Sequence, residues 1–283
     1  MSDIKLVNWL FNTGAVRVCP EGKPFWYTSG TIGPYYINTH FLYGSERKAL
    51  ELLETIDAIK ADRLGCPGKL NPVLKENYDS DDIYRGLVDS MLDFIRDNID
   101  LASVDYISGG ERRDWFFSLI AADILGKPHI TIYKDLSAVI TEKGETFPDK
   151  SINGAQVLHI ADLITEASSY ERAWLPAIKN IGGQLTNSVV VVDRLQGGAQ
   201  LLERNHVCSF AMVKIDRAFF DSALKMGLIS KGQYEMLLNY TADPRESMKT
   251  FLREHPEFLQ NALKSDSKTS ERARLCIEKN IYA

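Results

Sequence analysis

The middle of the chain alternates short apolar runs with longer amphipathic stretches. Runs of four or five mostly apolar residues predict β-strands, and apolar residues at helical spacing predict helices between them. The predicted strands are residues 104–108, 129–133, 156–160, 188–192 and 210–213, and the predicted helices are residues 115–125 and 169–180. Such alternation is typical of a parallel sheet with helices on both faces.

The residues before this region predict helices and loops. Ser45 and Ser80 each precede a stretch whose apolar side chains fall on one helical face, so both are predicted to cap a helix. Residues 65–72 lie between these helices and contain two glycines and two prolines, which predicts a loop.

The residues after this region are predicted to be all-helical, with Pro244 and Pro256 in first helical turns. They contain no chemical motif, and their simplest role is packing or dimerisation. The pattern therefore divides the chain into an N-terminal segment (1–100), an α/β core (101–217) and a helical C-terminal extension (218–283).

Composition excludes several classes of partner. The 283 residues carry 33 Lys+Arg and 38 Asp+Glu, a formal net charge of −5. This balance argues against nucleic acid or an anionic membrane as partner, although a local cationic pocket for a small anion remains open. No apolar run approaches the ~18 residues of a membrane span, and the N-terminus has no apolar signal core.

The cysteines and histidines add two expectations. The four cysteines lie far apart without a CxxC pair, so we expect reduced thiols and a cytoplasmic protein. The five histidines form no cluster at metal-ligand spacing, so we expect no metal held by the protein.

Polar residues follow four predicted strands at the edge where open parallel sheets bind ligands. The segments are residues 109–114, 133–135, 161–169 and 193–198. Three of them carry Arg or Lys, and residues 161–169 run into a helix N-terminus rich in hydroxyl groups. Backbone N–H groups at such a terminus favour a phosphate. The sequence therefore predicts an anionic, phosphorylated ligand.

Three segments resemble, in the same order, motifs of the type I phosphoribosyltransferases, and most closely those of the orotate phosphoribosyltransferases. Residues 157–169 resemble the motif that binds phosphoribosyl pyrophosphate (PRPP), in which an apolar strand leads to two acidic residues and a Thr/Gly-rich turn. Residues 25–38 resemble the N-terminal substrate segment, and residues 189–198 the strand that ends in Asp-Arg. The resemblance implies a type I phosphoribosyltransferase-like parallel sheet flanked by helices.

The same resemblance implies a reaction and a set of site residues. The enzyme would transfer phosphoribose from PRPP to an acidic pyrimidine base such as orotate, with Mg²⁺ bound to PRPP, and would form a homodimer. The implied catalytic residues are Asp162, which faces the ribose hydroxyls, and Lys134, which contacts pyrophosphate. The implied residues around PRPP and its phosphates are Thr165, Glu166, Ala167, Ser168, Ser169, Gly109, Gly110, Arg112 and Arg113. The implied base-binding residues are Tyr35, Tyr36 and Arg194, of which Arg194 reads the carboxylate of the base.

Several positions depart from the family pattern. Ala161 stands at the first acidic position of the PRPP motif, and Glu166, Ala167 and Ser168 replace Thr-Gly-Gly. Thr28 stands where the family has lysine, and residues 135–155 offer only Lys143 and Lys150 where the family has a basic mobile loop. A carboxylate that faces a phosphate repels it, and alanine disfavours the positive φ that glycine adopts freely.

These departures leave three functions open: an active transferase, a non-catalytic homologue that senses a phosphorylated ligand or a partner, and a protein for another phosphorylated sugar or nucleotide. Structural alternatives also remain for single residues. Asp193 and Arg194 could form a salt bridge, Arg112 and Arg113 a solvated loop, and Tyr35 and Tyr36 part of the core. His159 is expected to be a core histidine.

Overall fold

The computed structural model describes residues 4–148 and 151–282. The chain forms two compact units: unit 1 comprises Met1–Ala15 and Asn38–Ile215, and unit 2 comprises Val16–Ile37 and Asp216–Ala283. This grouping cuts across the three regions expected from the sequence, because residues 16–37 associate with the C-terminal helices. Their strands are only two or three residues long, too short for the local pattern to indicate what they pack against.

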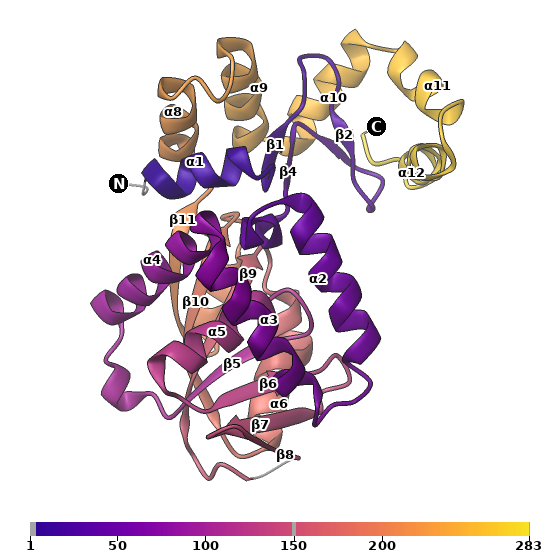
Figure 1. The fold of residues 1–283 in the computed structure, drawn as a ribbon. Helices are drawn as coiled ribbons and strands as arrows, with labels where there is room; N and C mark the ends of the chain where they lie inside the picture. Colours follow the sequence, from indigo (N-terminus) through magenta and orange to yellow (C-terminus); the bar gives the residue numbers. More distant parts are fainter. Residues whose placement is uncertain (1–3, 149–150, 283) are drawn as a thin grey trace. The chain divides into compact units, whose positions relative to one another are not determined.

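Unit 1 is built on a mixed sheet that has seven strands among its described residues. These are β5 (Tyr106–Gly110), β6 (His129–Ile132), β7 (Ala138–Glu142), β8 (Glu145–Pro148), β9 (Gln156–Ile164), β10 (Gln184–Asp193) and β11 (Cys208–Lys214). Their order is β11-β10-β9-β5-β6-β7-β8, parallel from β11 to β6 and antiparallel beyond (Figure 1). The expected parallel sheet is confirmed.

The hairpin β7–β8 corrects the prediction of a loop over residues 135–155. Lys143 and Gly144 form its turn, with φ angles of +52° and +82°. Positive φ at both central residues is the signature of a type I′ turn, whose twist matches that of the strands. Glu142 and Glu145 flank the turn, and these charged residues interrupt the alternation of apolar and polar residues that would indicate two strands. Lys150 lies outside the described residues.

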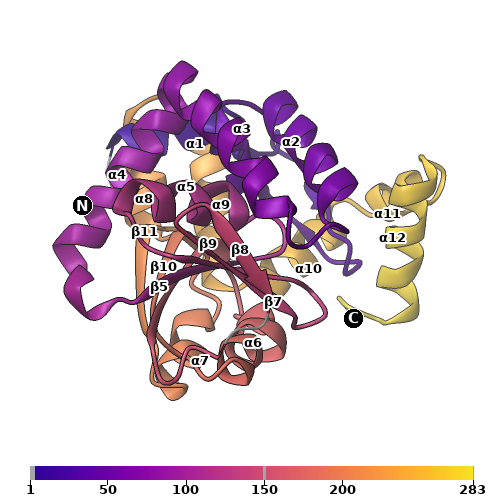
Figure 2. The same cartoon turned by 60° about the horizontal axis from the view of Figure 1, so that its bottom comes forward.

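Helices cover both faces of the sheet (Figure 2). Unit 1 contains α1 (Ile4–Asn12), η1 (Thr39–Tyr43), α2 (Glu46–Ile59), α3 (Cys66–Ser80), α4 (Asp82–Asn98), η2 (Leu101–Ser103), α5 (Trp115–Leu125), the π-helical turn η3 (Tyr170–Trp174), α6 (Leu175–Asn180) and α7 (Gly198–Arg204). Helix α5 packs against β5, β6 and β9, and α3 and α4 pack against α5. Because α5 lies between the sheet and the outer helices, its residues from Trp115 to Ala122 are all buried.

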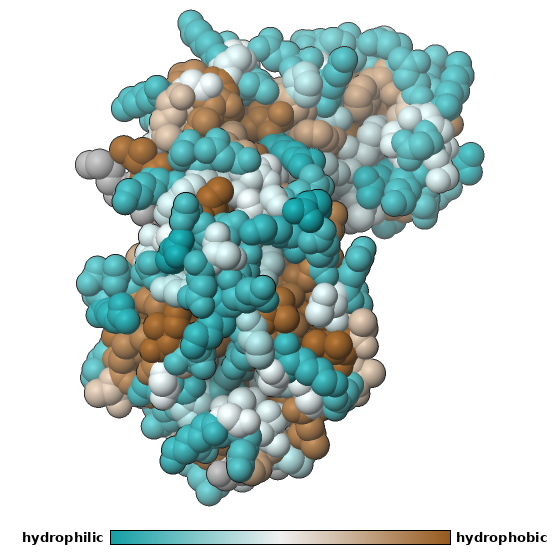
Figure 3. All heavy atoms as spheres, in the orientation of Figure 1, coloured by the Kyte–Doolittle hydropathy of each residue, from teal (hydrophilic) through white to brown (hydrophobic). Residues whose placement is uncertain are grey.

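The other face of the sheet has its own core. Side chains of η3, α6 and α7 form one apolar cluster there with β9 and β10; it includes Trp174, Ile178, Leu202, Val157 and Val190. On the face of unit 1 shown in Figure 3, hydrophilic side chains predominate and the apolar ones form small separate patches. No helix within the described residues is long and apolar enough to cross a bilayer.

Helix α3 corrects the expectation of a loop over residues 65–72. Pro67 lies in its first turn, where a missing N–H costs no hydrogen bond. Cys66, Leu70 and Leu74 are buried at a spacing of about one turn. Burial of this face therefore outweighs the turn signals of glycine and proline, even with Pro72 inside the helix.

The start of α4 corrects a second expectation. Ser45 caps α2 as predicted, with its side chain accepting the N–H of Lys48. Ser80, however, is the last residue of α3, and Asp81 caps α4 by accepting the N–H groups of Ile83 and Tyr84 at 3.0 and 2.9 Å. Ser80 and Asp81 are adjacent in the sequence, and the prediction of Ser80 as the cap was wrong by one residue.

Replacing Asp81 with alanine is expected to lower the free energy of unfolding by about 1–2 kcal/mol, because a helix cap is lost. The substitution also removes an ion pair with Lys48 at 2.8 Å. Urea denaturation of D81A and of Ser80→Ala measures the difference. Within the described part of the chain, the Ser80 hydroxyl donates to the Glu76 carbonyl of its own helix, so S80A should change stability by less than about 0.5 kcal/mol. Equal losses in the two variants would contradict the assignment of the cap to Asp81.

Unit 2 combines two short antiparallel strand pairs with five helices among its described residues. The strands are β1 (Val16–Val18), β2 (Phe25–Trp26), β3 (Ile32–Gly33) and β4 (Tyr35–Ile37), paired β1–β4 and β2–β3. The helices are α8 (Arg217–Lys225), α9 (Lys231–Ala242), α10 (Pro244–Glu254), α11 (Glu257–Leu263) and α12 (Ser267–Glu278). The helices confirm the prediction of an all-helical C-terminal region, and Pro244 lies in the first turn of α10 as predicted. Trp26 stacks on Phe258, which ties the strands to the helices.

Candidate functional site

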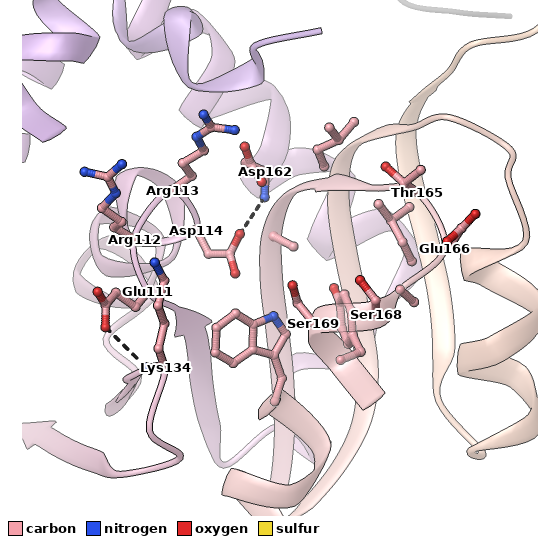
Figure 4. A pocket seen from close by; sticks show the side chains of 16 residues that line it. Glu111, Arg112, Arg113, Asp114, Lys134, Asp162, Thr165, Glu166, Ser168 and Ser169 are labelled. Carbon is pink, nitrogen blue, oxygen red and sulfur yellow. Dashed lines mark hydrogen bonds between the residues drawn. The ribbon is translucent and has the colours of Figure 1, made fainter. Parts of the chain in front are cut away.

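A cavity of about 350 Å³ lies in unit 1 at the carboxyl ends of β5, β6 and β9 (Figure 4). It is lined by residues 111–114, Lys134, residues 161–170 and Trp174. Three of the four strand-end segments singled out in the sequence therefore meet at one place. Parallel strands produce this convergence because their carboxyl ends share one edge of the sheet.

Gly109 and Gly110 do not line the cavity, contrary to the expectation that they form a loop at its pyrophosphate side. They are the last residues of β5 and pair with Thr131 and Ile132 of β6. A Cβ atom on Gly109 would lie 2.1 Å from the Oγ of Ser118, and one on Gly110 would lie 2.1 Å from the Cζ2 of Trp174. Close packing therefore explains why both positions are glycine.

Two buried carboxyl groups stand side by side in the cavity wall. Asp162 and Asp114 are 8% and 7% exposed. The Asp114 carboxylate accepts the backbone N–H of Asp162 at 3.1 Å and that of Gly110 at 3.0 Å. Burial, and next the charge of Asp114, raises the pKa of Asp162 to about 8, against the opposing effect of Arg113. The protonated form of Asp162 is therefore favoured over that of an ordinary aspartate.

The cationic side of the cavity is connected to the last turn of α2. Arg112 forms an ion pair with Asp57, and the Lys60 Nζ lies 2.8 Å from Asp57 and 3.0 Å from Glu111. The other oxygen of Glu111 accepts the backbone N–H of Lys134 at 3.2 Å. The peptide bond between Glu111 and Arg112 is cis. Arg112 is thus already paired with a carboxylate of the protein.

Arg113 differs from Arg112 in its surroundings. Its side chain is exposed and points toward Asp162 across the top of the cavity in Figure 4. A guanidinium in this place faces any anion that enters the cavity. Arg113 is therefore the arginine best placed to meet a ligand.

Residues 165–169 form the turn that leads from β9 into η3. Ala167 has a φ of +57°, which is the left-handed conformation that glycine adopts freely. The motif that this segment resembles has glycine here. The turn is held by the N–H of Gly198, which donates to the Thr165 carbonyl at 2.9 Å. Glu166 is exposed and its carboxylate points away from Arg113 and Lys134 in Figure 4. Its charge is therefore directed away from the cationic side of the cavity.

The three residues predicted to bind the base are not among the residues that line this cavity. Arg194 follows β10 and donates its backbone N–H to the Ile164 carbonyl at 3.0 Å, but it does not line the cavity. Tyr35 belongs to unit 2, is 2% exposed and packs edge-on against Phe220 and Tyr240. Tyr36 also belongs to unit 2 and donates its hydroxyl to the Trp26 carbonyl. The core alternative fits Tyr35, and base binding by all three residues stays a prediction.

Comparison with known proteins gives a consistent answer at low identity. No protein-family model matches the chain. An orotate phosphoribosyltransferase of Saccharolobus solfataricus is 32% identical over 89 residues, which are 31% of this chain and 45% of that protein. An orotate phosphoribosyltransferase of Sulfolobus acidocaldarius is 24% identical over 177 residues, which are 61% of this chain and 85% of that protein. Over these segments the chain is similar to orotate phosphoribosyltransferases.

Solved structures share the fold of this chain. The UMP synthase of Leishmania donovani matches with a TM-score of 0.57 at 16% identity, over 84% of this chain and 41% of that one. The orotate phosphoribosyltransferase of Aeropyrum pernix matches with a TM-score of 0.50 at 20% identity, over 78% of this chain and 99% of that one. The fold class expected from the sequence is confirmed. The first curated relative and the UMP synthase are each matched over less than half of their length.

Two residues that line the cavity escaped the sequence analysis. Asp114 belongs to a segment that was singled out, but beside two arginines it resembled an ordinary surface charge. Trp174 lies in a predicted helix whose apolar residues are expected in the core. Its proximity to Gly110 follows from the π-helical turn η3, which no sequence pattern indicated.

Proposed function

We propose that the chain transfers phosphoribose from PRPP to a pyrimidine base such as orotate and releases pyrophosphate. The observation that carries this proposal is the meeting of Asp162, Arg113, Lys134 and the turn 165–169 in one cavity at the carboxyl ends of parallel strands. The relationship to proteins named orotate phosphoribosyltransferase supports orotate as the base.

The cavity offers a separate group to each part of PRPP. Backbone N–H groups and hydroxyls of the turn 165–169 would hold the 5′-phosphate. Arg113 and Lys134 would balance the charge of the pyrophosphate, most strongly as it departs. In the protonated form that burial favours, Asp162 can both donate to and accept from the ribose hydroxyls.

The reaction exchanges one bond at C1′ of the ribose. The bond from C1′ to the pyrophosphate oxygen breaks, and a bond from C1′ to a ring nitrogen of the base forms. The electron pair leaves with pyrophosphate, and the nitrogen proton passes to water.

We propose that Arg194 binds the carboxylate of the base, a task for which the planar guanidinium is suited.

Magnesium enters this proposal as part of the substrate, bound to the pyrophosphate of PRPP. Within residues 4–148 and 151–282, no group of three or more His, Cys, Asp or Glu side chains is placed to hold a metal ion. A homodimer remains the expectation from the resemblance, and a cytoplasmic location remains the expectation from the cysteines and the N-terminal segment.

A second candidate function is a non-catalytic homologue that senses a phosphorylated ligand. Ala161 gives β9 one carboxyl group where the family has two, and Arg112 is engaged by Asp57. Both features weaken contacts that a transferase would use.

Calorimetry with magnesium-PRPP, followed by an assay of orotate consumption, separates the two functions. Binding with turnover is expected for the transferase, and binding without turnover with any base supports the sensor. Absence of PRPP binding would contradict both, and thermal stabilisation by a different phosphorylated sugar or nucleotide would then identify the ligand class.

Arg194→Lys tests the assignment of orotate. The substitution should weaken the binding of orotate far more than the binding of PRPP, and equal losses would mean that Arg194 is structural.

A further inference from the structure

The Asp114 carboxylate joins the ends of two neighbouring strands. One oxygen accepts the N–H of Gly110, the last residue of β5, at 3.0 Å. The other oxygen accepts the N–H of Asp162 in β9 at 3.1 Å. The ladder pairs of β5 and β9 run only from Tyr106–Val157 to Ser108–His159. Beyond that point, where the cavity opens, Asp114 bridges the two strands instead.

A buried histidine faces the same carboxylate from within the sheet. The Nε2 of His159 lies 3.5 Å from the Oδ2 of Asp114, and its Nδ1 lies 2.9 Å from the Ser108 Oγ. The imidazole is fully buried and packs between the rings of Tyr170 and Trp174, at centroid distances of 5.0 and 6.0 Å. The expected core histidine thus borders the Asp114 bridge and leaves the carboxylate little room to turn.

We propose that Asp114 is a positioning residue that sets the spacing between the 111–113 turn and Asp162 across the cavity. This inference rests on the proposed function, because the spacing matters through PRPP, which would contact both sides. Asp114 also supplies a second acidic group next to Asp162, which β9 lacks because Ala161 occupies the first acidic position of the motif. The protein thus takes this group from the start of α5, which follows the neighbouring strand β5.

The chain offers a matched control at the opposite end of the same two strands. The Asp105 carboxylate accepts the N–H of Gln156 at 2.8 Å, so it too joins the β5 side to β9, but at the amino ends of the strands. Asp114→Asn and Asp105→Asn therefore make the same chemical change on the same pair of strands. In D114N the new side-chain amide would accept one N–H through its oxygen, while its NH₂ group would face the other N–H.

The test is the affinity for magnesium-PRPP, measured by calorimetry between pH 6 and pH 9. D114N is expected to bind at least ~10-fold more weakly at pH 7, consistent with the loss of a charge-assisted hydrogen bond, and D105N within about twofold of the wild type. The charged groups that line the cavity with Asp162 are Asp114, Arg112, Arg113, Glu111, Lys134 and Glu166. Wild-type affinity should fall as the pH rises through about 8, because Asp162 then becomes an anion in an anion site.

In D114N this fall should move to lower pH, because the charge of Asp114 no longer raises the pKa of Asp162. An unchanged affinity and pH profile in D114N would overturn the inference. So would an affinity loss that D105N shares.

Amide hydrogen exchange tests the bridge without any ligand. The Gly110 and Asp162 amides should have similar protection in the wild type, and both should lose it in D114N but not in D105N. If the wild type binds no PRPP, the proposed function fails, and this exchange pattern alone supports or refutes the bridge. If D114N does not fold, widely different protection of the two amides in the wild type refutes it.

Discussion

Alanine at position 110 is expected to lower the free energy of unfolding by about 1–3 kcal/mol, the usual cost of an overpacked core position. Its Cβ would lie 2.1–2.4 Å from three carbon atoms of the Trp174 indole. The indole is buried and neighbours the His159 ring, so it cannot yield without disturbing the core behind the cavity. Urea denaturation measures the loss, and calorimetry with magnesium-PRPP should show weaker binding because Trp174 lines the cavity.

Gly68→Ala is the matched control for this substitution. Gly68 lies in α3, and a Cβ built on it meets no atom within 4 Å among the described residues. Alanine favours the helix over glycine, so G68A should raise stability by roughly 0.5–1 kcal/mol. If G110A were as stable as the wild type, Trp174 could not lie against Gly110.

Replacing Arg113 with glutamine is expected to weaken magnesium-PRPP binding by about 10- to 100-fold. The reason is the loss of a charge-assisted hydrogen bond to a phosphate, worth about 1.5–3 kcal/mol, with each 1.4 kcal/mol equal to a factor of ten. Stability should hardly change because the side chain is exposed. Calorimetry at fixed salt measures the affinity, and urea denaturation checks the fold.

Arg112→Gln controls for the general loss of positive charge. Arg112 is the sequence neighbour of Arg113 and lines the same cavity, but it is paired with Asp57. Its replacement should weaken PRPP binding less than R113Q does. A larger loss in R112Q would mean that Arg112 leaves Asp57 to bind the ligand and that Arg113 is the spectator.

The sequence predicted well what depends on long, regular patterns. Residues 129–133 and 188–192 are mostly apolar because their strands are buried on both faces, and both segments form strands of the sheet. The carboxyl ends of parallel strands share one edge of the sheet, and this alone predicted that Arg113, Lys134 and Asp162 lie close together. Pattern and topology together therefore located most of the cavity.

The expectations that failed depend on contacts that no local pattern records. Gly109 and Gly110 belong to a strand because β6 pairs with them, and Trp174 covers Gly110. The role of Asp114 depends on two backbone N–H groups from different strands. Tyr35 packs against helices about 185 and 205 residues further along the chain, by its contacts with Phe220 and Tyr240.

The pairing of Arg112 with Asp57 has a consequence for how the cavity responds to salt. An exposed guanidinium attracts mobile ions from solution, and a ligand that displaces them binds more weakly as salt is added. Here the counter-ion is a carboxylate fixed to α2, and its local concentration does not change with the buffer. An anion that binds Arg112 must displace Asp57, so the last turn of α2 would change its contacts when the anion binds. The contribution of Arg112 to the affinity for the anion would therefore depend little on ionic strength.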